Sequence, residues 1–103
     1  MDLFPKFIIE DDYLILSKVS FHQELVTDPA KVKGGGWFRY LGQTDMFIFY
    51  GDSHDYGKAE LEDIINCIKS NKVFTNIYQT VDISLKHNFG YDNGSEIIDI
   101  TNK

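Results

Sequence analysis

The segment from Met46 to Ile68 constrains the fold of this chain more than any other. It begins with an apolar run over 46–50, continues through a polar loop with a glycine at each end, Gly51 and Gly57, and passes into a helical pattern. The pattern consists of apolar residues spaced i, i+3, i+4 and i+7: Leu61, Ile64, Ile65 and Ile68. This order predicts a strand, a tight loop and an amphipathic helix over 58–70 whose apolar face lies on a sheet.

The loop over 51–57 is the best candidate for a binding site. A loop that opens into a helix can bind an anion through backbone N–H groups, because the first helical turn leaves its donors unpaired. Ser53 could add a hydroxyl donor, although a serine near a helix start more often forms a cap or a turn. Asp52 and Asp55 argue against this function, because two carboxylates repel a phosphate unless they face away from it.

Most of the remaining chain favours β-strands. The runs 4–9 and 13–21 are separated by acidic residues and predict an N-terminal hairpin, followed by a helical turn at 22–25. Trp37 to Leu41 and Met46 to Tyr50 are joined by four residues and predict a second antiparallel hairpin. Further short strands are predicted over 73–78, 81–85 and 96–101, with a turn over 88–94.

These elements predict an α+β fold in a single domain over 1–103. We expect a mixed, mostly antiparallel β-sheet with one main helix over 58–70 and, at most, a short second helix packed on it. The glycine triplet at 34–36 predicts a close approach of two backbone segments, a positive φ angle, or both. The aromatic residues that follow it, Trp37, Phe38 and Tyr40, are most simply interpreted as core.

Composition and charge exclude several classes of protein. The formal charge of −6 disfavours binding to nucleic acid and to anionic membranes, and it suits a basic protein partner. The single cysteine, Cys67, rules out an internal disulfide and indicates a reducing compartment. Because the chain has no long apolar run, we expect a soluble cytoplasmic protein. The histidines are too widely spaced to predict a metal site, and no cofactor is expected.

Three further residues each allow a reactive and a structural interpretation. His22 could serve as a general base or nucleophile, since imidazole changes charge near neutral pH, or it could be a turn histidine. Arg39 could clamp an oxyanion, or it could lie on a solvated face. Cys67 lies near the buried stripe of the predicted helix, so a nucleophilic role is not expected.

The chain resembles the janus/ocnus family of small phosphohistidine phosphatases. The resemblance is carried by Gly34-Gly35-Gly36, followed by an apolar strand that ends in Tyr50-Gly51-Asp52-Ser53-His54-Asp55-Tyr56-Gly57 and then a helix. It implies that the loop binds a phosphoryl group through backbone N–H groups and Ser53, while His22 acts as the base. The resemblance covers about half of the chain, from Tyr13 to Ile68.

The chain departs from the family pattern at three places. A lysine that the family uses near the start of its first strand has no clear counterpart, because Asp12 and Tyr13 occupy that region. Trp37 stands where the family has an arginine directly after the glycine triplet, and Asp55 stands where the animal enzymes have a small residue. The loss of cations and the gain of a carboxylate weaken the case for phosphatase activity more than the case for a shared fold.

Two classes of function therefore stay open. The first is a phosphohistidine-phosphatase-like enzyme that binds a phosphorylated protein or a small anion, with His22 as catalytic base. Its expected phosphate-binding residues are Gly51, Ser53, His54, Asp55, Gly57 and Arg39. The second is a non-catalytic acidic module, inhibitor-like or immunity-like, that keeps the fold and binds a protein partner through the exposed loop.

Overall fold

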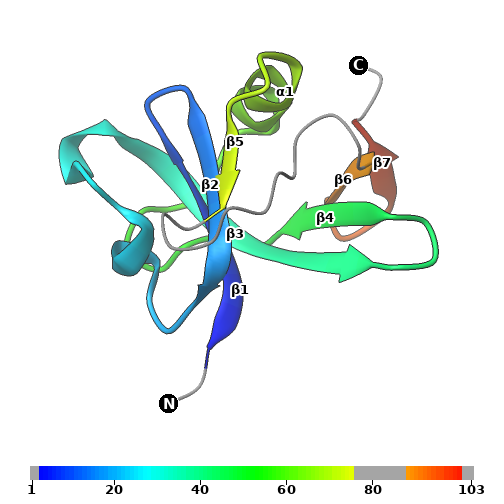
Figure 1. Ribbon diagram of the computed structural model, residues 1–103, viewed down its shortest axis with the longest axis horizontal. Helices are drawn as coiled ribbons and strands as arrows, with labels where there is room; N and C mark the ends of the chain where they lie inside the picture. The colour runs from blue at the N-terminus through cyan, green and yellow to red at the C-terminus, as the bar shows by residue number, and fades with distance from the viewer. Residues whose placement is uncertain (1–2, 76–87, 101–103) are drawn as a thin grey trace.

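The computed structural model describes residues 3–75 and 88–100, and within these ranges the chain forms a curled seven-stranded sheet with one α-helix (Figure 1). In chain order, the elements are β1 (Phe4–Glu10), β2 (Tyr13–Val19), the 3-10 turns η1 (His22–Leu25) and η2 (Pro29–Lys31), β3 (Val32–Leu41), β4 (Met46–Tyr50), α1 (Leu61–Lys69), β5 (Val73–Thr75), β6 (Asn88–Asp92) and β7 (Ile97–Asp99). The strand order across the sheet is β5-β2-β1-β3-β4-β6-β7. The predicted α+β class is confirmed.

Both predicted hairpins are present. Strands β1 and β2 pair from Phe4↔Val19 to Glu10↔Tyr13, and β3 and β4 pair from Trp37↔Tyr50 to Leu41↔Met46. Strand β3 is longer than predicted, because the glycine triplet belongs to it and pairs with β1. The sheet is mostly antiparallel, as expected, and among the described strands only the β2–β5 and β4–β6 pairs are parallel.

The prediction of a turn over 88–94 is wrong. Residues 88–92 form β6, which runs parallel to β4, and the actual turn follows at 93–96, where the Asn93 side chain accepts hydrogen bonds from two backbone N–H groups. Phe89 and Tyr91 alternate onto the core face of β6, so burial outweighs the turn preference of the intervening residues.

Strand β7 confirms part of the predicted strand over 96–101. Strand β5 confirms the first part of the one over 73–78, and the strand predicted at 81–85 lies outside the described residues.

Helix α1 packs on one face of the sheet through the predicted apolar stripe. Ile64 is fully buried there, and Leu61, Ile65 and Ile68 pack against the same core. The helix begins at Leu61 rather than at residue 58, because Lys58 bridges to Gly35 of β3 and Glu60 keeps an extended backbone. No helix within the described part of the chain is long and apolar enough to cross a membrane.

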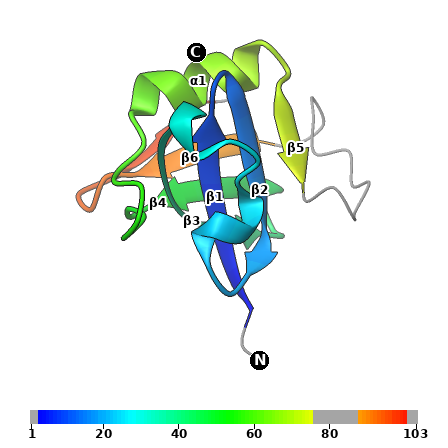
Figure 2. The same ribbon diagram turned by 90° about the vertical axis from the view of Figure 1, so that its left-hand side faces the viewer.

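The other face of the sheet is covered by the segment that contains η1. Ile8 of β1 and Val19 of β2 pack there with Leu25 of η1, while the alternate β1 residues Phe7 and Ile9 face α1. Figure 2 shows η1 and α1 on opposite sides of the β1–β2 hairpin. The helical turn predicted at 22–25 is therefore confirmed as a 3-10 turn, and it places His22 on the face opposite α1.

The predicted aromatic core after the glycine triplet is confirmed only in part. Phe38 is buried against the α1 side, Trp37 is half-buried on the opposite face, and Tyr40 is exposed. Tyr40 lies near the turn of the β3–β4 hairpin, where its hydroxyl donates a hydrogen bond to Asp45 at 2.5 Å. The aromatic run is therefore divided between core, site and solvent.

Candidate functional site

The glycine triplet of β3 lets the loop segment pass directly against the strand backbone. An added Cβ atom on Gly34 would lie 2.7 Å from the carbonyl oxygen of Lys58, and one on Gly36 would lie 2.6 Å from that of Tyr50. Between these two contacts, the Gly35 N–H donates a 3.0 Å hydrogen bond to the carbonyl oxygen of Gly57. Gly34 and Gly36 thus border the two ends of the loop segment, and a side chain at either position would push that backbone away.

The loop over 51–57 closes on itself through its backbone. Ser53 and Gly57 exchange N–H···O=C bonds of 3.1 and 2.9 Å, and Gly51 and Gly57 adopt the left-handed φ angles of +71° and +78°. The loop was predicted to open directly into the helix, and this prediction is wrong, because extended residues separate Gly57 from α1. The unpaired donors of the first helical turn are therefore not part of this loop.

The loop itself supplies other donors. The N–H groups of His54 and Asp55 donate to no acceptor among the residues that the structure describes. Ser53 is only 2% exposed, and its hydroxyl oxygen accepts a 3.2 Å bond from the Tyr56 N–H. Ser53 therefore does not cap α1, whose N-cap is Glu60; its hydroxyl instead stabilises the turn of the loop, and it still has its own hydrogen to donate.

His22 is held next to the loop by the same strand. Its ring is buried, and its Nε2 lies 2.8 Å from the carbonyl oxygen of Gly36. Since a carbonyl only accepts, Nε2 carries the hydrogen and donates it, so Nδ1 of the neutral ring carries the lone pair. A side chain at Gly35 would crowd this ring, because an added Cβ atom there would lie 3.3 Å from His22 Cδ2.

The surroundings of His22 keep the ring neutral. Burial lowers the pKa of His22 below its usual 6.5, and the positive charge of Lys6 lowers it further. The hydrogen bond to Gly36 and the negative charges of Asp55 and Asp52 act in the opposite direction without reversing the shift. These last two effects also show that the loop carboxylates are close enough to interact electrostatically with the ring.

Lys6 is the cation that the sequence interpretation missed. It lies on β1 directly opposite Trp37, is 9% exposed, and donates a 2.8 Å hydrogen bond from Nζ to the carbonyl oxygen of Ser20. Asp12 and Tyr13, which occupy the region where the resemblance implies a lysine, lie beyond the end of β1 at Glu10. The sequence did contain a sign of this role, because Lys6 is a single lysine within an otherwise apolar β-run. A lysine is rarely buried in such a run unless its charge has a partner.

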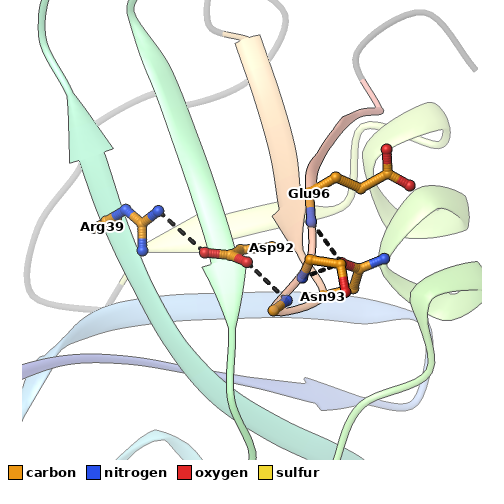
Figure 3. Close-up of polar contacts among 6 residues, drawn as sticks. Arg39, Asp92, Asn93 and Glu96 are labelled. Carbon is orange, nitrogen blue, oxygen red and sulfur yellow. Dashed lines mark hydrogen bonds and ion pairs between the residues drawn. The ribbon is translucent and has the colours of Figure 1, made fainter.

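Arg39 is engaged elsewhere on the sheet. Its Nη2 forms a 3.2 Å ion pair with Asp92 of β6, across the intervening strand β4 (Figure 3). Its guanidinium carbon also lies 5.3 Å from the Tyr50 ring centroid. The hydrogen bond from the Gly94 N–H has the largest effect on Asp92 and the bond from Arg39 the next largest, and together they hold the pKa of Asp92 below its usual value. Arg39 thus lies near the start of the loop, but the contacts described for it are to β4 and β6. Its role in phosphate binding stays a prediction.

The remaining candidates are placed as follows. His54 and Asp55 are both exposed in the loop. No group of metal-ligating side chains occurs within the described residues. Cys67 is buried in α1, where burial raises the pKa of its thiol to about 11, which is unsuited to a nucleophile.

No protein-family model, curated protein or solved structure matched the chain. The case for a function therefore depends on the geometry of the site, and the resemblance to the janus/ocnus family stays a prediction.

Proposed function

We propose that the chain is a phosphohistidine-phosphatase-like enzyme that binds a phosphoryl group on the 51–57 loop and uses His22 as its base. One observation carries this proposal: adjacent residues of β3 hold the two parts of the site. Gly35 binds the loop through Gly57, and Gly36 binds the imidazole of His22. The loop donors and the imidazole are thereby fixed relative to each other by a rigid strand.

The loop supplies donors for the phosphoryl oxygens. The N–H groups of His54 and Asp55 and the hydroxyl hydrogen of Ser53 can each donate to an oxygen whose charge grows as the phosphoryl group transfers. The Lys6 ammonium donates one bond to Ser20, which leaves further hydrogens for a ligand. This cation offsets part of the repulsion from Asp52 and Asp55.

His22 can act through Nδ1. In the proposed reaction, a water oxygen bonds to phosphorus while the bond from phosphorus to the leaving nitrogen breaks, and the nitrogen keeps the electron pair of that bond. Nδ1 accepts the proton from the water and then returns it to the leaving nitrogen, which restores the neutral ring. Alternatively, Nδ1 itself attacks phosphorus, and water then hydrolyses the phosphorylated ring. Both routes require the neutral ring that burial favours.

The proposal is tested by binding and turnover together. Titration with orthovanadate should shift the amide signals of residues 53–57, and the wild-type chain should release phosphate from a phosphohistidine peptide. His22→Ala should reduce turnover by about 100-fold or more, because general base catalysis contributes at least that much. Lys69→Met, on the exposed end of α1, serves as a control and should behave as wild type.

A non-catalytic protein-binding module is the second candidate. It is favoured by the exposed carboxylates of Asp52 and Asp55, which oppose an anion but could contact a basic protein. Absence of both amide shifts and phosphate release would overturn the enzyme proposal in favour of this one.

A further inference from the structure

The proposed phosphoryl site is bordered by an aromatic rim, which we define as Phe4, Phe21 and Trp37. The Nζ atom of Lys6 lies 5.7, 5.9 and 5.0 Å from their respective ring centroids, so the rim surrounds this one ammonium group. Trp37 also meets the His22 ring edge-on, with centroids 6.5 Å apart. The apolar surface of the rim is therefore continuous with the base of the proposed site.

Two rings of this rim are open to solvent. Phe21 is 60% exposed and Phe4 is 41% exposed. Leaving apolar surface in water costs about 25 cal/mol per Å², so exposed phenylalanines together around a site are more typical of a contact surface than of a passive one.

Phe21 is exposed on an ordered turn. The Glu24 carboxylate accepts hydrogen bonds of 2.7 and 2.9 Å from the N–H groups of Ser20 and Phe21, which fixes the backbone at the start of η1. The next residue is His22, whose ring is held by Gly36. The same turn thus presents the exposed ring and the proposed base in a fixed relation.

The charges around the site indicate what kind of ligand covers the rim. A free phosphate dianion meets a chain of charge −6 and the exposed carboxylates of Asp52 and Asp55, and Lys6 is the cation whose charge acts on His22. A polypeptide can place its phosphoryl group near Lys6 while a basic residue of its own faces the loop carboxylates. A polypeptide can also supply an apolar side chain for the rim.

We propose that the aromatic rim binds an apolar side chain next to the phosphorylated residue of a polypeptide substrate, so that the site selects phosphorylated protein segments over small phosphorylated molecules. This inference rests on the proposed function. It adds a preference at a flanking position, which is set by Phe4 and Phe21 rather than by the groups that contact the phosphoryl group.

The test compares two phosphohistidine peptides that differ in one residue. Both contain a lysine, and one carries leucine where the other carries glycine, with the leucine moved in turn through the neighbouring positions on each side. At one or more of these positions, we expect the leucine peptide to have a kcat/KM about tenfold higher with the wild-type chain, the size expected for filling an apolar contact. Phosphoramidate serves as the small phosphorylated probe and should be a poorer substrate than either peptide.

Matched variants test whether the aromatic rim causes the preference for the leucine peptide. Phe21→Ala should bring the leucine-to-glycine ratio of kcat/KM close to one, and Phe4→Ala should reduce it. Phe74→Ala removes a phenylalanine that is 49% exposed on the edge strand β5, which β2 separates from β1, and it should keep the wild-type ratio. If Phe21→Ala does not fold, as judged by its amide spectrum, Phe4→Ala still tests the rim.

The outcomes separate this inference from the function on which it rests. Equal turnover of both peptides by the wild-type chain at every position, or an unchanged ratio in Phe21→Ala, would overturn the proposed role of the rim in substrate selection. Neither result would contradict the proposed enzymatic function. Release of phosphate from none of the probes, together with no amide shifts in orthovanadate, would overturn the proposed function and the rim with it.

Discussion

At the scale of single residues, the state of His22 decides what the site can do. Its Nε2 is occupied by Gly36, so the available nitrogen is Nδ1, and burial is the largest influence that keeps the ring neutral. Lys6 contributes to the same effect while offering hydrogens to a ligand. One buried lysine thus supports both the neutral base and the binding of an anion.

The first prediction concerns the pH dependence that follows from His22. Because its pKa is lowered in the folded chain, we expect kcat/KM to stay constant above pH 6.5 and to fall as the pH drops through the lower folded value. The stability contributed by this residue has the same direction: it is fully present above 6.5, the usual value, and is lost as the pH falls through the folded pKa. The pKa itself is measured by NMR titration of the His22 ring.

The Lys6→Met variant checks whether the charge of Lys6 contributes to the lowered pKa of His22. Removing the charge should raise the pKa of His22, whereas Lys69→Met should leave it unchanged. A His22 ring that titrates at or above 6.5 in the wild-type chain would contradict the assignment.

At the scale of elements, the turns that carry His22 are tied to the sheet by Glu10 at the end of β1. This buried carboxylate accepts hydrogen bonds from the N–H groups of Thr27 and Asp28, at 2.7 and 3.1 Å, and from the Thr27 hydroxyl. Burial acts to raise the pKa of Glu10, but these bonds and the charge of Lys31 outweigh it and hold the pKa below its usual value. Glu10 thus fixes the segment between η1 and η2.

The second prediction is that Glu10→Gln destabilises the chain by about 1–3 kcal/mol at pH 7, since one side of a buried set of hydrogen bonds is weakened. The effect should shrink in acid, because the carboxylate contributes stability above its unfolded pKa and loses it as the pH falls through the lower folded value. Urea unfolding at several pH values measures this. Glu62→Gln, exposed on α1, is the control, with an expected change of about 0.3–1 kcal/mol.

The elements also show which features can be predicted from sequence. Both hairpins and the apolar face of α1 were predictable, because each is encoded by residues close together in the chain. The parallel placement of β6 beside β4 and the late start of α1 depend on contacts with distant residues. The turn-forming composition of 88–94 therefore misled the interpretation.

The candidate site also contains residues that could be predicted from the sequence and residues that could not. His22 and the loop were predictable from local pattern and resemblance, and the structure places both against the glycine triplet. Lys6 was not predictable as a neighbour of His22, because its position depends on the β1–β3 register that sets Lys6 opposite Trp37. The ion pair of Arg39 with Asp92 likewise joins residues on separate strands.

At the scale of the whole molecule, the charge of −6 acts on every ligand before contact. The third prediction is that salt has opposite effects on two kinds of ligand. Raising NaCl from about 20 mM to about 200 mM shortens the screening length, so KM should fall for phosphoramidate, an anion that the chain repels. For a lysine-rich phosphohistidine peptide, KM should rise.

Steady-state kinetics at matched pH checks this prediction. Sodium acetate at the same ionic strength replaces NaCl as the control for chloride competing at the loop. A salt response of the same sign for both ligands would contradict long-range repulsion as the cause.

The closure of the 51–57 loop has an evolutionary consequence. The loop takes its shape from main-chain bonds between Ser53 and Gly57 and from the fit of Gly57 against Gly35, and the side chains at 52, 54 and 55 contribute none of these bonds. Those three positions are therefore free to mutate without loss of the loop conformation. A library randomised at these positions alone would vary ligand preference on a constant scaffold, and natural drift can sample the same variation at little cost in stability.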